Sequence, residues 1–74
     1  MNRSRVHVQY RDGSKAQGIR VVLSIHGRGM SKSAFTDRHG TAIVEHASVG
    51  TADVIVRGKR RGSFRAPGET VVFV

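Results

Sequence analysis

The chain has 74 residues, no cysteine and a formal net charge of +8. This size predicts a single domain, residues 1–74, held together by packing and strand pairing, because neither disulfides nor thiolate metal sites are available. The longest apolar runs are far shorter than a membrane-spanning helix and the N-terminus has no signal peptide, so the sequence as written predicts no membrane span and a cytoplasmic location, unless it is part of a longer chain.

Alternating apolar and polar residues predict short β-strands in the first third of the chain. Val6, Val8 and Tyr10 alternate with polar residues and are followed by an Asp-Gly turn signal. A second alternation follows, and the loop HGRGMS, with its two glycines, ends it. This alternation predicts a second strand whose inward-facing side chains are Ile19, Val21, Leu23 and Ile25.

The middle of the chain repeats the pattern around a tight turn, TDRHG. The Asp37 carboxylate can accept hydrogen bonds from backbone N–H groups one or two residues on, and Gly40 can close the turn with a positive φ. Two strands are predicted after it, TAIVEH and TADVIVR. Their predicted inward residues are Ala42, Val44, Val54 and Val56.

The last third contains the basic segment RGKRRGSFR, which predicts an exposed turn from Arg57 to Arg61 and a brief strand, GSFRA. A Pro-Gly turn then leads to the apolar run TVVFV, which we expect to dock within its own sheet, leaving a monomer or a weak dimer. No window sustains a helical period. The sequence therefore predicts an all-β fold, a single antiparallel β-sandwich of about seven short strands, transthyretin-like or immunoglobulin-like.

Two segments in order resemble carboxypeptidase regulatory-like domains, which are transthyretin-like or prealbumin-like sandwiches. VQYRDGSKAQGIRVVLSI looks like the opening hairpin of that family, and AFTDRHGTAIVEHASVGTADVIV is similar to its T-D-x-x-G turn and outgoing V-x-V strand. The two cover most of residues 6 to 56. The resemblance implies a non-catalytic accessory or interaction module beside an enzyme, receptor or adhesin, with no shared active site.

The basic segment also resembles the KOW motif of small RNA-binding barrels, in which a strand ends in a glycine-bracketed basic turn. This alternative predicts a nucleic-acid contact through phosphates. The rival interpretation is a solvated hairpin whose charges keep a sheet edge from pairing with neighbours. Both stay open at this point. The candidate polyanion-binding residues are Arg57, Lys59, Arg60, Arg61 and Arg65.

The four aromatic residues limit base stacking, because a core this small is expected to use most of them. We expect Tyr10 and Phe73 in the core, and Phe64 exposed between Ser63 and Arg65.

Catalytic and metal-binding patterns are missing from the sequence. The histidines have no ligand-pair spacing and are predicted to lie on the surface, although His7 and His26 could approach each other across a sheet. Asp12 and Asp37 read as turn formers, which leaves no acid/base pair. The sequence therefore predicts no enzyme, no cofactor and no metal. The expected function is a non-enzymatic accessory or interaction module with an unknown protein partner, and the alternative is a small RNA- or DNA-binding barrel.

Overall fold

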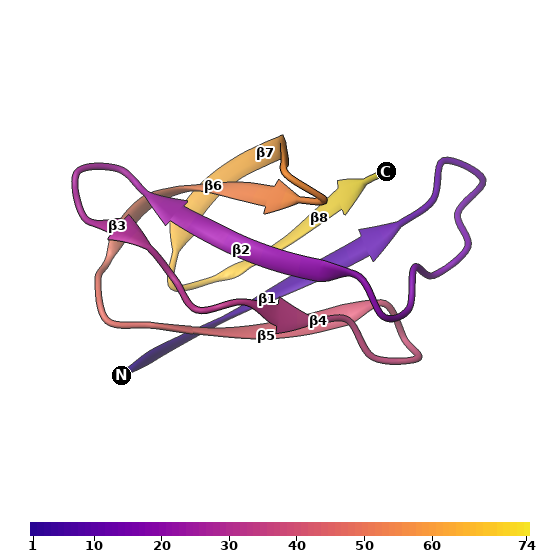
Figure 1. Ribbon diagram of the computed structural model, residues 1–74, viewed down its shortest axis with the longest axis horizontal. Coiled ribbons are helices and arrows are strands. Elements are labelled where there is room, and N and C mark those ends of the chain that lie inside the picture. The colour runs from indigo at the N-terminus through magenta and orange to yellow at the C-terminus, as the bar shows by residue number, and fades with distance from the viewer.

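The computed structural model describes residues 1–74 as two β-sheets packed face to face, without a helix (Figure 1). This confirms the predicted all-β sandwich, with eight short strands rather than about seven. The structure has no helix with the length and apolarity that crossing a bilayer requires. The strands are β1 Asn2–Gln9, β2 Arg20–Ile25, β3 Gly29–Met30, β4 Ala34–Phe35, β5 Thr41–His46, β6 Gly50–Val56, β7 Lys59–Ala66 and β8 Glu69–Phe73.

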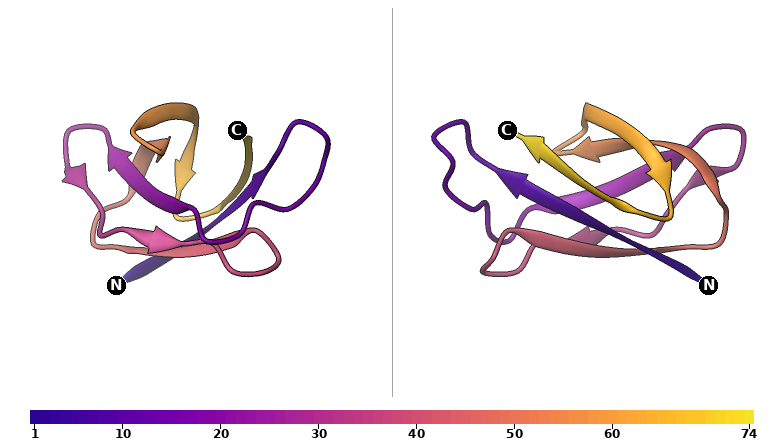
Figure 2. Two further views of the ribbon diagram at one scale, coloured as in Figure 1. Left: turned by 45° about the vertical axis from the view of Figure 1, so that its right-hand side comes forward. Right: turned by 180° about the vertical axis from the view of Figure 1, so that it is seen from behind.

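The first sheet, sheet A, has the strand order β5-β1-β8, and the second, sheet B, has the order β3-β2-β6-β7 with β4 also paired to β2. In Figure 1, β2 of sheet B lies in front of β1 and β8. In the right-hand view of Figure 2, turned by 180°, β1 and β8 of sheet A lie in front of β2. The chain changes sheets between β7 and β8, so the β6–β7 hairpin and the C-terminal strand belong to different layers.

One strand pair departs from the predicted antiparallel arrangement. β8 runs parallel to β1, with Val6 beside Thr70 and Val8 beside Val72. The C-terminal strand is thus docked in its own sheet, as expected, and Val74 N–H donates to the Gln9 carbonyl. β8 is an edge strand with no partner on its other side, and weak dimerisation stays a prediction.

The core lies between the sheets and consists mostly of small aliphatic side chains. The inward phases predicted for β2, β5 and β6 are confirmed, because all the residues predicted to face inward are buried. β5 and β6 alternate buried and more exposed residues at the period of two that a pleated strand imposes, whereas in β2 the outward-facing Val22 is buried as well. The buried cluster comprises Val6, Val8, Ala16, Ile19, Val21, Leu23, Ile25, Ala42, Val44, Ala52, Val54, Val56, Ala66 and Val72.

The turn before β5 has the predicted geometry. The Asp37 carboxylate accepts hydrogen bonds from the N–H groups of His39 (2.8 Å) and Thr41 (3.1 Å), and Gly40 has a φ of 75°. These N–H donors hold the pKa of Asp37 below its usual range, the Thr41 bond more than the His39 bond. The turn therefore fixes where β5 enters sheet A beside β1.

The aromatic predictions are wrong for three residues. Phe73 is 50% exposed and Tyr10 37% exposed, whereas Phe64 packs against the core. The reason is the phase of each strand. Val72 takes the inward position of β8 and forces Phe73 outward, while Phe64 shares the inward face of β7 with Gly62 and Ala66, where small neighbours leave room for a ring.

Candidate polyanion-binding surface

The basic segment forms a strand rather than a long turn. Only Arg57 and Gly58 connect β6 to β7, and both have positive φ, 53° and 78°. A two-residue loop with two positive φ values corresponds to a type I′ turn, which usually holds Asn-Gly. The predicted turn from Arg57 to Arg61 is therefore wrong beyond Gly58, because pairing with β6 begins at once at Lys59.

A β-bulge interrupts the pairing of β6 with β7. Val54 lies opposite Gly62 and Ile55 opposite Arg60, so Arg61 is the extra residue. Of the five candidate residues, Arg61 is the one that is not fully exposed, and its Nε is enclosed without a hydrogen-bond partner. The residues Arg57, Lys59, Arg60 and Arg65 are exposed.

Asp53 fixes one of these cations. Arg60 Nε lies 3.0 Å from Asp53 Oδ1, and His26 Nε2 lies 3.1 Å from Oδ2 of the same carboxylate. The Arg60 guanidinium, and after it His26, hold the pKa of Asp53 below its usual range. Among the Arg and Lys residues, only Arg3 and Arg60 have a carboxylate within ion-pair distance, so Arg57 and Lys59 have none. Their charge is therefore available to a partner.

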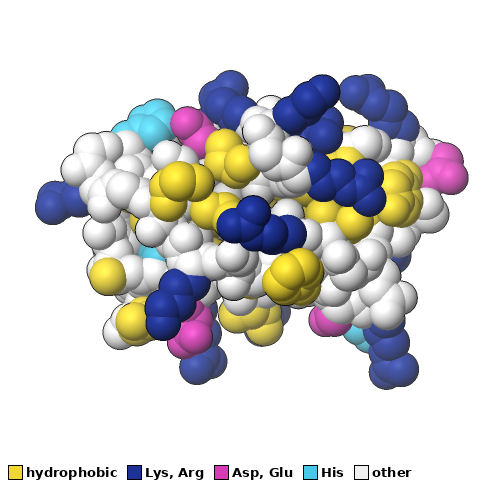
Figure 3. All heavy atoms as spheres, in the orientation of Figure 1, with side chains coloured by type: hydrophobic (Ala, Val, Ile, Leu, Met, Phe, Trp, Pro, Cys, Tyr) yellow, Lys and Arg dark blue, Asp and Glu magenta, His cyan; other side chains and the backbone are white.

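A groove lies on the outer face of sheet B beside this hairpin, with a volume of about 370 Å³. Val22 of β2 and Ile55 of β6 are directly opposite each other in the pairing of the two strands. Figure 3 shows the molecule in the orientation of Figure 1, in which β2 lies toward the viewer. Lys and Arg side chains lie across the upper half of this face, with hydrophobic side chains between them. The groove is lined by Arg20, Val22, Met30, Ile55, Arg57 and Gly58.

Arg20 is the cation of this groove that lies outside the predicted basic segment. Its Nε donates to Ser33 Oγ at 3.1 Å, which leaves the terminal nitrogens of the guanidinium available. Arg20 also lies opposite Phe35, which is 64% exposed. The outward phase of Arg20 could be read from the alternation of β2, but its proximity to Arg57 depends on the pairing of β2 with β6. The groove can therefore contact an anionic group and an apolar group together.

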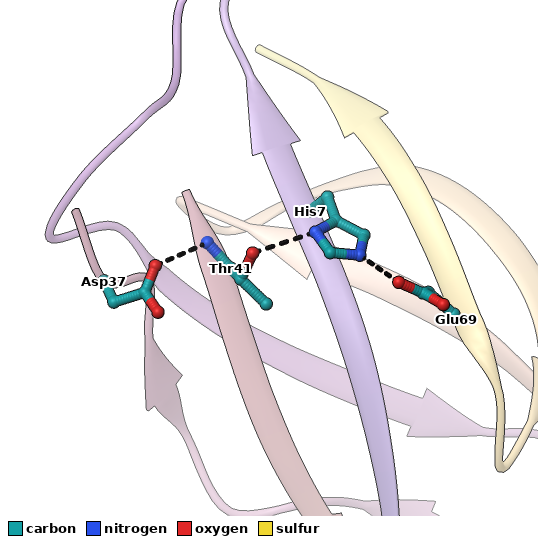
Figure 4. Close-up of polar contacts among 4 residues, drawn as sticks. All are labelled: His7, Asp37, Thr41 and Glu69. Atoms are coloured by element: carbon teal, nitrogen blue, oxygen red, sulfur yellow. Dashed lines mark hydrogen bonds and ion pairs between the residues drawn. The ribbon is translucent and has the colours of Figure 1, made fainter. Parts of the chain in front are cut away.

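Sheet A carries a separate polar cluster on its outer face (Figure 4). His7 Nδ1 is 2.9 Å from Thr41 Oγ1, and His7 Nε2 contacts the Glu69 carboxylate. The hydrogen bond from His7 holds the pKa of Glu69 below its usual range, with a smaller contribution from the charge of His7. These contacts join the three strands of sheet A, and no group of three or more His, Cys, Asp or Glu side chains is arranged to hold a metal ion.

The histidines do not all lie on the surface. His46 is buried, with its Nε2 2.8 Å from Ser4 Oγ and its Nδ1 2.7 Å from the Ser48 carbonyl. Because that carbonyl can only accept, the Nδ1–H group of His46 donates this hydrogen bond. His7 lies in sheet A and His26 follows β2 of sheet B, and the two contact different carboxylates, so they do not approach each other across one sheet.

The comparisons with known proteins identify no relative of this chain. No protein-family model matches it, and neither a curated protein nor a solved structure is similar enough to be significant.

The acid sensitivity of the fold follows from its carboxylates. Asp12, Asp37, Asp53 and Glu69 have pKa values lowered by hydrogen bonds and cations of the folded state. A lowered folded-state pKa contributes stability that is present above the unfolded pKa, about 4, and is lost as the pH falls through the folded value. We expect the melting temperature to fall between about pH 5 and about pH 2.

The Asp53→Asn variant tests the contribution of Asp53, whose pKa is lowered by its contacts with Arg60 and His26. Its melting temperature should depend less on pH over that range, because the charge that attracts Arg60 and His26 is gone. Glu45→Gln is the control for losing one negative charge, since Glu45 has only a 3.7 Å contact with Arg3. A pH profile of Asp53→Asn equal to that of the parent protein would contradict the assignment.

Proposed function

We propose that this protein is a non-enzymatic interaction module that binds an acidic partner protein through the outer face of sheet B. The observation that carries the proposal is the set of cations on this face that have no carboxylate partner, on a chain with a net charge of +8. Oppositely charged surfaces accelerate association and select partners. Those cations are Arg20 and Arg57, which line the groove, and Arg65, which is exposed on β7 opposite the outward-facing Thr51.

The carboxylates support a binding role over a catalytic one. Asp12 and Asp37 accept hydrogen bonds within their own turns, and the other three contact cations or His7 and His26 in the sheets. A general acid or base needs to reach a substrate proton. The resemblance to carboxypeptidase regulatory-like domains supports the same choice, because it implies an accessory module. That the chain belongs to this family is part of the proposal.

An RNA- or DNA-binding role is the second candidate, and the exposed aromatic residues favour it. Three of the four aromatics are exposed, contrary to expectation, and Phe35 lies beside Arg20. Single-strand binders combine cations with rings on which bases stack. The packed two-sheet sandwich, and a basic run that is mostly strand, do not support the KOW-like barrel that the sequence alternative assumed.

A charge-neutralised variant tests the proposal. The triple substitution Arg20→Gln, Arg57→Gln and Arg65→Gln should weaken binding to poly-glutamate about tenfold, because each exposed charge contributes up to about 1 kcal/mol. Arg60 is kept so that its ion pair with Asp53 persists. Affinity is measured by fluorescence anisotropy at low salt and over a salt series.

The control removes the same net charge elsewhere, with Arg5→Gln, Arg11→Gln and Arg38→Gln, all exposed and outside sheet B. It should lose much less affinity than the sheet B variant. Equal losses would indicate attraction to the overall charge and contradict a defined binding face. Binding of oligothymidylate but not poly-glutamate would favour the second candidate.

A further inference from the structure

We infer that the groove on the outer face of sheet B recognises an acidic segment in which a carboxylate side chain is adjacent to an aliphatic one. The carboxylate contacts Arg20 and Arg57, and the aliphatic side chain covers Val22, Ile55 and Met30. This inference rests on the proposed function and specifies the chemistry of the partner.

The floor of the groove is apolar although it faces outward. Val22 is on the outer face of β2 and yet only 7% exposed, Ile55 is half-buried, and Met30 is 67% exposed. Outward positions of a two-layer sandwich are usually polar. An apolar floor between charged side chains offers area that only a partner with an apolar group would cover.

The cations at the groove suit a carboxylate. Arg20 and Arg57 have no ion-pair partner within the chain, and Ser33 holds Arg20 through its Nε. Guanidinium groups bind carboxylates through two parallel N–H···O bonds, which orient the ligand as well as attract it. A partner carboxylate would therefore supply the charge that the groove lacks.

The backbone of Arg57 provides a second, independent observation. Its φ of 53° is the only positive value at a non-glycine residue of the chain. This conformation is unfavourable for a residue with a Cβ, and a turn of this type prefers Asn or Gly. Such strain is typical of positions whose side chain serves a function. At this position it accompanies a side chain that lines the groove.

The floor favours a peptide over a nucleic acid. Bases stack on aromatic rings, whereas the floor consists of Val, Ile and Met side chains, and Phe35 is outside the lining. A small inorganic anion would use the arginines but not the floor. A peptide that places leucine beside glutamate uses both.

Two short peptides of equal charge test this inference, with central sequences Glu-Leu-Glu and Glu-Ser-Glu and blocked ends. The leucine peptide should bind about tenfold more tightly, because covering one aliphatic side chain is worth about one factor of ten. Backbone amide NMR titration should place the largest shifts at Val22, Ile55, Arg57 and Gly58. Ile55→Thr should reduce the advantage of leucine and leave the serine peptide unaffected.

Arg57→Asn separates binding from folding. It should weaken the binding of both peptides, because it removes a guanidinium group from the groove. It should also raise the melting temperature by several degrees, because Asn tolerates the positive φ that Arg57 adopts. Arg38→Gln is the control for one lost charge and should change neither quantity by a comparable amount. A lower melting temperature for Arg57→Asn would overturn the strain argument.

The outcomes distinguish this inference from the proposed function. If the two peptides bind equally tightly while poly-glutamate binding still depends on the cations of sheet B, the inference about the groove is overturned and the proposed function stands. If neither peptide nor poly-glutamate binds and an oligothymidylate of about ten nucleotides shifts the same amides, both are overturned.

Discussion

Gly40→Ala is expected to destabilise the protein by about 3 kcal/mol or more, which is a large fraction of the roughly 4 to 11 kcal/mol typical of a chain this short. A Cβ at this position would lie 2.7 Å from the Val8 carbonyl oxygen and 3.2 Å from the Ala16 nitrogen. Those two atoms are hydrogen-bonded to each other at 3.1 Å, so neither can move without breaking that bond. The positive φ of Gly40 adds a further cost.

Gly18→Ala is the matched control for the backbone term. Gly18 has a φ of 71°, close to the 75° of Gly40, but an added Cβ would meet no atom within 4 Å. We therefore expect a loss of about 1 kcal/mol from conformation alone. Urea denaturation monitored by circular dichroism measures both variants. Similar losses for the two alanines would show that steric contact at Gly40 is unimportant.

Leu23→Ala is expected to cost about 3 kcal/mol. Leu23 is the largest fully buried side chain, and it lies at the centre of β2 between the two sheets. Removing its isobutyl group loses the transfer free energy and leaves a cavity, since the strand pairing around it limits collapse. The midpoint of urea unfolding should fall accordingly, with an unchanged slope.

Ile43→Ala is the control for shortening an aliphatic side chain on a strand. Ile43 is on the outer face of β5 and 52% exposed, so its loss should cost less than about 1 kcal/mol. A larger effect for Ile43→Ala than for Leu23→Ala would mean that the interior lies elsewhere than between the two sheets.

The local features of this fold were predictable because their causes are close in sequence. The inward phase of Val21, Leu23 and Ile25 follows from a period of two within one strand. The turn at Asp37 and Gly40 depends on a carboxylate and on backbone amides within four residues of it. Such signals need no knowledge of the partner strands.

The phase of the C-terminal strand and the end of the basic turn were not predictable in this way. The run VVFV does not alternate, so nothing in it favours Val72 over Phe73 as the buried residue. The inward choice depends on the parallel pairing with β1. Lys59 and Arg60 similarly became strand residues because β6 supplies their hydrogen-bond partners.

The amino-acid sequence alone determined the all-β class, the phases of the alternating strands, the Asp37 turn and the large positive charge, because each depends on composition or on neighbours along the chain. The tertiary structure alone decided that β8 is parallel to β1 and that Arg20 and Arg57 line one groove with an apolar floor. The physical reason is that strand register and the packing of two sheets bring together residues more than thirty positions apart, and no local pattern encodes that distance.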